Sequence, residues 1–397
     1  MHNMKKNLIF TISTLALLIT MLLGSLVSCN KKLDLAQPIA YTQDTVSYTL
    51  GDYISSDANY SFYKLMTVKV GIYSTLTDKT QINTVFAPNN NAIKQLIAFA
   101  TGGAVPLNSP DAVFAGFIIN ASAATVTGLL GPIVKYSIIP GISLIRDSIT
   151  QSFPNIQLPT TLSAGNIPGT ILPFAVTAFP SRRGSTIWYN NVPSLGQVAS
   201  TGNGVLYGLF GPAIPPSQVM AQILYSDSRF TIFHAAINRG DSGQPAASQI
   251  DAALANPGAN LTLFAPTNTA MKQLIFGLSG GAIPIAAPDA VFIGFINNFV
   301  SPRVAQGLVA YHFMGTRAFS VNFPATEAFF PTLLNRAIPI HPGVKVQSFF
   351  TGPVVDSIKV TGVGNGGVAA TSKPASNFDK NAVNGIIHII DRVLLPQ

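Results

Sequence analysis

The sequence predicts an α+β protein made of two tandem domains, each a β-sandwich or wedge packed with several short helices. Residues 85–120 align without gaps to residues 263–298, with 22 identities in 36 positions at a constant offset of 178. Early in each copy, apolar residues recur every three or four positions, which is typical of a helix with one buried face. Later in each copy, apolar and β-branched residues alternate with polar ones, which is typical of strands.

The second copy shows the expected elements in order. Residues 261–264 predict a strand, which is short because Pro266 stops it. Thr267 or Asn268 then caps a helix whose apolar residues fall three or four apart, at Met271, Leu274, Ile275 and Leu278. In the first copy, the order Ser109, Pro110, Asp111 predicts another helix start, with the Ser109 hydroxyl as the cap.

The remaining elements of the second copy are expected to be strands. Residues 344–347, 354–360 and 386–393 are rich in valine and isoleucine at alternating positions. Between them, residues 362–367 fit the pattern GxGxxG, but they lead into Val368 and Ala369 rather than a helix. A glycine-rich hairpin is therefore favoured over a phosphate-binding loop.

Composition excludes two broad classes of protein. Only 23 + 15 = 38 of the 397 residues are charged, and the mean hydropathy is +0.38. Yet only residues 8–28 form an apolar run of the length that spans a bilayer, which argues against a polytopic membrane protein. A chain so rich in apolar residues and so poor in charge is also unlike a disordered one.

The N-terminus has the features of a secretory signal. Lys5 and Lys6 precede an apolar stretch, which ends in small residues before Cys29. This segment resembles the bacterial lipoprotein signal. The resemblance implies cleavage after Ser28 and lipidation of Cys29, which anchors the protein to a membrane without a protein span. Because Cys29 is the only cysteine, disulfides, thiolate catalysis and cysteine-based metal sites are not expected.

Four segments follow from the signal and the repeat. They are a signal peptide (1–28), a linker from the lipidated cysteine (29–44), a first domain (45–213) and a second domain (214–397). Removal of Lys5 and Lys6 leaves a net charge of 21 − 15 = +6. After the signal, the only adjacent basic pairs are Lys31–Lys32 and Arg182–Arg183. No nucleic-acid partner is expected, because such binding needs a clustered basic face.

Three sequence blocks resemble those of the fasciclin (FAS1) domain. The first block is TVFAPNNNAI at residues 84–93, and it recurs as TLFAPTNTAM at residues 262–271. The second is the pair Tyr311–His312, and the closing block is NGIIHIIDRVLLP at residues 384–396. The first copy departs from this pattern, since it has Tyr136–Ser137 and a closing segment, residues 203–210, without the histidine and the aspartate.

The resemblance implies a non-catalytic protein that binds or adheres. We expect a lipid-anchored protein of the cell envelope, at the outer membrane and facing either the periplasm or the exterior. Its partner would be a protein or glycan of the envelope or the extracellular matrix. The alternative is an accessory glycan- or nutrient-binding lipoprotein of an outer-membrane uptake system. No serine can be tied to a histidine and an acid by sequence, and no nucleophile elbow is identified, so no enzyme is expected.

Candidate site residues fall into two groups. Tyr311 and His312 are binding candidates, and so are Trp188 and Tyr189, which would stack on a sugar ring or pack their own insertion. Asn384, His388 and Asp391 are expected to be structural hydrogen-bonding residues of the closing block. No cofactor and no metal are expected, because the four histidines after the signal are far apart and lack ligand spacing.

Overall fold

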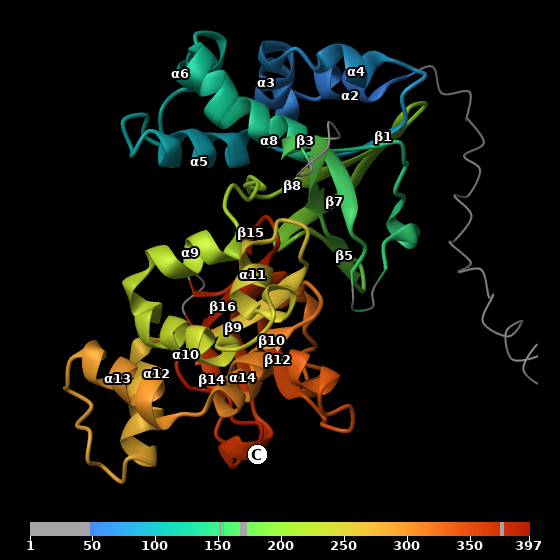
Figure 1. Ribbon diagram of the computed structural model, residues 1–397. Helices are drawn as coiled ribbons and strands as arrows, with labels where there is room; N and C mark the ends of the chain where they lie inside the picture. Colours follow the sequence, from blue (N-terminus) through green and yellow to red (C-terminus); the bar gives the residue numbers. More distant parts are fainter. Residues whose placement is uncertain (1–47, 151–152, 154, 167–172, 374–376) are drawn as a thin grey trace, which may run out of the picture. The chain divides into compact units, whose positions relative to one another are not determined.

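The computed structural model describes residues 48–397, except 151–152, 154, 167–172 and 374–376 (Figure 1). The expected signal peptide, Cys29 and the linker 29–44 lie outside the described residues. The described residues belong to one compact unit that holds both copies of the repeat. The fold class expected from the sequence, α+β, is confirmed by the helices and sheets of each copy.

The first copy begins with helices, and its strands follow the opening strand β1. Its helices are α2 (Leu50–Ser56), α3 (Ser61–Val70), α4 (Tyr73–Thr77), α5 (Asn90–Ala100), α6 (Asp111–Ile119), α7 (Ala123–Thr125) and α8 (Gly131–Tyr136). Its strands are β1 (Asn83–Pro88), β2 (Ile138–Pro140), β3 (Leu158–Asn166), β4 (Pro173–Ala178), β5 (Pro180–Arg183), β6 (Thr186–Tyr189), β7 (Val192–Thr201) and β8 (Gly204–Leu209). One sheet has the order β2-β1-β8-β7-β6-β5, and β3 pairs with β4.

The second copy repeats this plan with a different insertion. Its helices are α9 (Met220–Ser226), α10 (Thr231–Asp241), α11 (Ile250–Ala255), α12 (Asn268–Leu278), α13 (Asp289–Phe299) and α14 (Pro302–Tyr311). Its strands are β9 (Leu261–Pro266), β10 (Phe313–Met314), β11 (Ala328–Phe330), β12 (Val344–Thr351), β13 (Val354–Thr361), β14 (Ala370–Ser372), β15 (Lys380–Ala382) and β16 (Gly385–Ile390). Two sheets result, β10-β9-β16-β15 and β11-β12-β13-β14.

The centre of each copy is a parallel pair made by the opening and closing blocks. β1 pairs with β8, so that Asn83 lies opposite Gly204. β9 pairs with β16 in the same way, and Leu261 lies opposite Gly385. All other strand pairs among the described residues are antiparallel. These four central strands are buried along their whole length, because each of them has a packed layer on both faces.

Alternation along β1 supplies two separate cores in the first copy. Val85 and Ala87 pack under the helices, in a cluster with Leu206 of β8. Phe86 points to the other face, where it packs with Tyr136 and Tyr207. The second copy divides Leu263 and Phe264 between two clusters in the same way. Successive side chains of a strand alternate between the faces of its sheet, so one short block builds both cores.

Two of the expected helix starts have different outcomes. Thr267 caps α12 as expected, since its side chain accepts a hydrogen bond from the backbone N–H of Ala270. The expected Ser109 cap is wrong: Pro110 occupies the cap position of α6, and no side chain caps that helix. Residues 362–367 connect the antiparallel strands β13 and β14, as expected for a hairpin.

Replacing Gly204 by alanine should strongly destabilise the first copy. Gly204 has φ +142°, and an added Cβ would lie 1.8 Å from the carbonyl oxygen of Asn83 on the paired strand. We expect the free energy of unfolding to fall by about 3 kcal/mol or more, measured by chemical denaturation. The matched control is Gly116→Ala in α6, where an added Cβ meets nothing within 4 Å. Equal stabilities of the two variants would contradict this account of the central pair.

Candidate functional site

The asparagine that opens each closing block is a buried structural residue. Asn384 accepts a hydrogen bond from the backbone N–H of Met220 at 2.8 Å and donates to the carbonyl oxygens of Leu254 (2.9 Å) and Asn256 (2.8 Å). Asn203 holds the first copy in the same way: it accepts from Leu50 at 2.8 Å and donates to two carbonyl oxygens. The closing block thus fixes the first helix of each copy.

His388 and its counterpart Tyr207 perform the same structural task with different chemistry. His388 Nε2 lies 3.0 Å from the carbonyl oxygen of Ala318, and its ring stacks on Phe264. Tyr207 donates from its hydroxyl to the carbonyl oxygen of Leu144 at 2.8 Å, and its ring stacks on Phe86. Leu144 and Ala318 are equivalent, since the N–H of each donates to the threonine at the same position of the opening strand.

The Tyr311–His312 pair is buried and hydrogen-bonded. Tyr311 donates to the carbonyl oxygen of Gly343 at 2.7 Å. His312 Nδ1 lies 2.8 Å from the carbonyl oxygen of Leu308, and Nε2 accepts from the N–H of Leu394 at 3.0 Å. His312 is therefore a neutral imidazole protonated on Nδ1, and burial lowers its pKa to about 4. Binding through Tyr311 or His312 stays a prediction, and it would require the second copy to open.

The first copy compensates for the missing histidine of this pair. Ser137 stands in place of His312, and its hydroxyl lies 2.6 Å from the hydroxyl of Tyr63. In the second copy, Phe233 of α10 packs against the His312 ring at 5.5 Å. The polar Tyr63 on α3 thus accompanies the small Ser137, whereas the apolar Phe233 on α10 accompanies the larger His312. The departure of the first copy from the family pattern preserves a filled and hydrogen-bonded core.

Trp188 and Tyr189 lie on β6 and are also buried. The Trp188 indole N–H donates to the carbonyl oxygen of Pro353 at 2.9 Å. The Tyr189 hydroxyl donates to the carbonyl oxygen of Tyr136, and its ring packs 4.5 Å from that of Phe86. Their ring faces are therefore not available to a sugar in this conformation, and stacking by them stays a prediction. Asp391 is exposed and accepts from the N–H of Thr371 at 2.7 Å.

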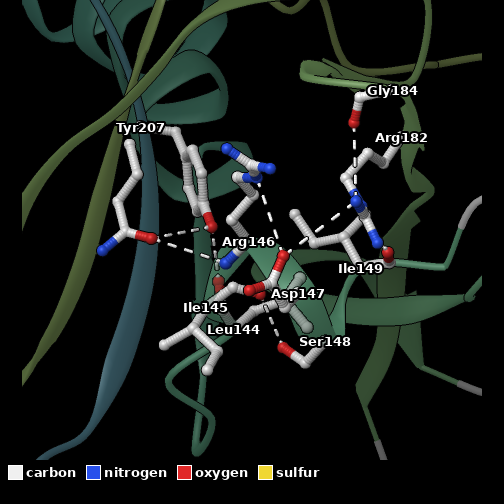
Figure 2. Close-up of polar contacts among 10 residues, drawn as sticks. Leu144, Ile145, Arg146, Asp147, Ser148, Ile149, Arg182, Gly184 and Tyr207 are labelled. Carbon is white, nitrogen blue, oxygen red and sulfur yellow. Dashed lines mark hydrogen bonds and ion pairs between the residues drawn. The ribbon is translucent and has the colours of Figure 1, made fainter.

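The basic pair Arg182–Arg183 does not form a basic patch. Arg182 Nε donates to the carbonyl oxygen of Ile149, and the side chain lies near Asp147, which also faces Arg146 (Figure 2). Arg183 points to the opposite side of β5, donates to two backbone carbonyl oxygens and stacks over Phe350 at 4.2 Å. Alternation along the strand separates the two cations, and their hydrogen bonds go to the fold.

A buried polar cluster in the second copy has no counterpart in the sequence-based expectations. Ser320 donates from its hydroxyl to Asp379, while His388 Nδ1 accepts from the backbone N–H of Asp379 at 3.3 Å. Burial raises the pKa of Asp379 and lowers that of His388. The three residue types are those of a hydrolase, but the serine bonds the aspartate instead of the histidine, and Ser320 and His388 are buried while Asp379 is half-buried. This arrangement offers no activated nucleophile.

Arg317 is a second buried charge that the sequence did not single out. It donates to the carbonyl oxygens of Ala382 (3.2 Å) and Val383 (2.8 Å), and its guanidinium lies 4.6 Å from the ring of Phe179. Burial lowers its pKa to about 10. Arg317 lies between β10 and β11 and Asp379 between β14 and β15, where no sequence periodicity marks a residue that will be buried.

The described residues form a surface hollow but hold no cluster of metal ligands. Among the described residues, no group of three histidine, aspartate, glutamate or cysteine side chains is placed to hold a metal ion. A hollow of about 440 Å³ is lined by Ser185, Thr186, Ser194, Leu195, Gly196, Phe210, Gly352 and Pro353. In the described part, no single helix is long and apolar enough to cross a bilayer. By length and composition alone, α6 and residues 123–136 together meet that criterion as a bent pair.

The fold and its closing block define an α+β module whose signature polar residues hold the structure together. Residues 228–396 match the family model of the fasciclin domain, so the second copy is a fasciclin domain. The first copy repeats its sequence and its central strand pairing, and the protein has tandem FAS1 domains. Fasciclin domains are binding and adhesion modules rather than enzymes.

The chain is similar to a FAS1 domain pair from the insect cell adhesion molecule fasciclin I, with 15% identity and a TM-score of 0.34. That match covers 86% of this chain and 98% of the insect chain. A search of curated proteins gave no match.

The buried, neutral His312 should make the second domain lose stability in mild acid. The folded pKa of about 4 lies below the ordinary 6.5, so His312 favours folding above pH 6.5 and loses this contribution as the pH falls towards 4. A shift of this size corresponds to about 3 kcal/mol between pH 7 and pH 4. Chemical denaturation over this range should show a steeper loss for the wild type than for His312→Gln. Parallel pH profiles of the two proteins would refute the assignment.

Proposed function

We propose that this protein is a lipid-anchored binding or adhesion protein of the bacterial cell envelope. The observation that carries the proposal is the tandem fasciclin architecture behind a sequence that resembles a lipoprotein signal. The partner is a protein or glycan of the envelope or the extracellular matrix. Because the signature polar residues are used by the fold, the partner is recognised by exposed surfaces of the two domains.

The anchor is tested by the pair of variants Cys29→Ala and Ser28→Ala. The first removes the thiol that would receive the lipid, and the second keeps a small residue before an intact thiol. In a bacterial host fed a labelled fatty acid, we expect Cys29→Ala to lose the label and to leave the membrane fraction. Ser28→Ala should keep both. Labelled Cys29→Ala protein would contradict lipidation at this position.

The binding activity is tested with vesicles that carry the lipidated protein. We expect such vesicles to be retained on surfaces coated with envelope or extracellular-matrix material, and protein-free vesicles to wash off. Soluble protein added in excess should compete with the vesicles. Equal retention of vesicles with and without the protein would refute adhesion while leaving the lipid anchor intact.

A second candidate function is glycan binding as part of an uptake system. The observation that favours it is the hollow of about 440 Å³ beside β6 and β7, a volume in the range of small-molecule sites. Its lining combines hydroxyl groups of Ser185 and Thr186 with apolar surface from Leu195 and Phe210, and it contains no charged side chain. Hydroxyl groups beside an exposed aromatic ring suit a neutral sugar.

This second candidate predicts that Phe210 contributes to binding. Phe210 is half exposed, so Phe210→Ala should leave the thermal stability nearly unchanged while weakening sugar binding about tenfold or more. A glycan array followed by calorimetry on any hit gives the measurement. The matched control is Phe349→Ala, an exposed phenylalanine outside the lining of the hollow. An array without hits, or equal affinities for both variants, would refute this candidate.

A further inference from the structure

The α5–α6 hairpin of the first domain exposes apolar side chains that its own core does not use. Phe99, in the last turn of α5, is 86% exposed, and Ile119, at the end of α6, is 55% exposed. After Asp111, every residue of α6 is apolar or glycine, yet only two of its nine residues are buried. A helix that is apolar all round is normally covered on all sides. Part of this hairpin therefore lacks its cover.

The second domain also exposes apolar residues on its α12–α13 hairpin, some of them at equivalent positions. Leu278 ends α12 and is 66% exposed. Ile285 and Val291 are exposed at the positions that Leu107 and Val113 occupy in the first domain. The shared part of the exposed surface is thus Leu107 and Val113, whereas Phe99 and Ile119 align with Gly277 and Asn297 and belong to the first domain alone.

The hairpin offers almost no charge to a partner. From residue 80 to residue 134 the only charged side chains are Lys94 and Asp111, and they pair with each other at 2.5 Å. The second domain repeats this pair with Lys272 and Asp289 at 2.7 Å. The surface is thus apolar and electrically neutral. It suits an apolar, weakly charged layer, and it has no basic cluster of the kind that recognises anionic lipids.

We propose that the α5–α6 hairpin lies on the lipid bilayer that anchors the protein, with Phe99 at the boundary of headgroups and acyl chains. This inference rests on the proposed lipidation of Cys29. The described chain begins at Tyr48, 48 − 29 = 19 residues later, and such a tether extends up to about 65 Å. A domain of about 160 residues has a radius of gyration of about 15 Å, so the tether lets the hairpin reach the bilayer. Apolar side chains on a surface helix bind at this depth of a bilayer.

The test uses the full lipidated protein with Phe99→Trp, reconstituted into phosphatidylcholine vesicles. The lipids carry either plain or brominated acyl chains, because bromine quenches a tryptophan only on close approach. We expect the emission of the tryptophan at position 99 to fall about twofold or more with brominated lipid. The effect should persist at raised ionic strength, since no charge pairing is involved. The parent protein, whose only tryptophan is the buried Trp188, supplies the background.

The matched control is Ile340→Trp, at a position that is 94% exposed and outside both hairpins. It should show no quenching, and circular dichroism should confirm that both variants fold. If the protein floats with the vesicles but position 99 is not quenched, bilayer docking is refuted and the lipid anchor stands. A blue-shifted but unquenched emission would identify a protein partner, such as a second copy, and would also refute it. Failure to float would refute lipidation and, with it, this inference.

Discussion

The parallel pairing of the opening strand with the closing strand is the interaction on which each domain depends. It joins residues far apart in the chain, as between Asn83 and Gly204, and it carries both cores. A buried asparagine beside the pair, Asn203 or Asn384, fixes the first helix with hydrogen bonds that no solvent can replace. Loss of such a side chain leaves buried groups unsatisfied at about 1–3 kcal/mol each. The first helix and the pairing of the opening and closing strands are thereby stabilised together.

The comparison of the two domains shows which features the fold requires and which it leaves free. A tyrosine hydroxyl replaces an imidazole in donating to the same carbonyl, as Tyr207 does for His388. Tyr63 and Ser137 share a hydrogen bond where the second domain packs Phe233 against His312. Because these substitutions conserve packing and hydrogen bonding rather than residue type, the signature residues act in folding.

The low charge of the chain is reflected in how its few charges are used. Arg183 and Arg317 donate to backbone carbonyl oxygens and stack on phenylalanine rings, and Lys94 pairs with Asp111. Much of the surface is covered instead by neutral polar and apolar groups. Such a surface gives little electrostatic steering and little repulsion between molecules.

The sequence by itself determined the duplication, the α+β class, the capped start of α12 and the strands of the closing block, because periodicity and turn residues are local signals. It also identified the polar residues of the signature blocks. The tertiary structure decided that β8 and β16 run parallel to the opening strands, and that Trp188 and Tyr189 are buried. It alone revealed Arg317 and Asp379, since the polar partners of each are distant in sequence. Burial and pairing of distant segments are set by packing, which no local pattern encodes.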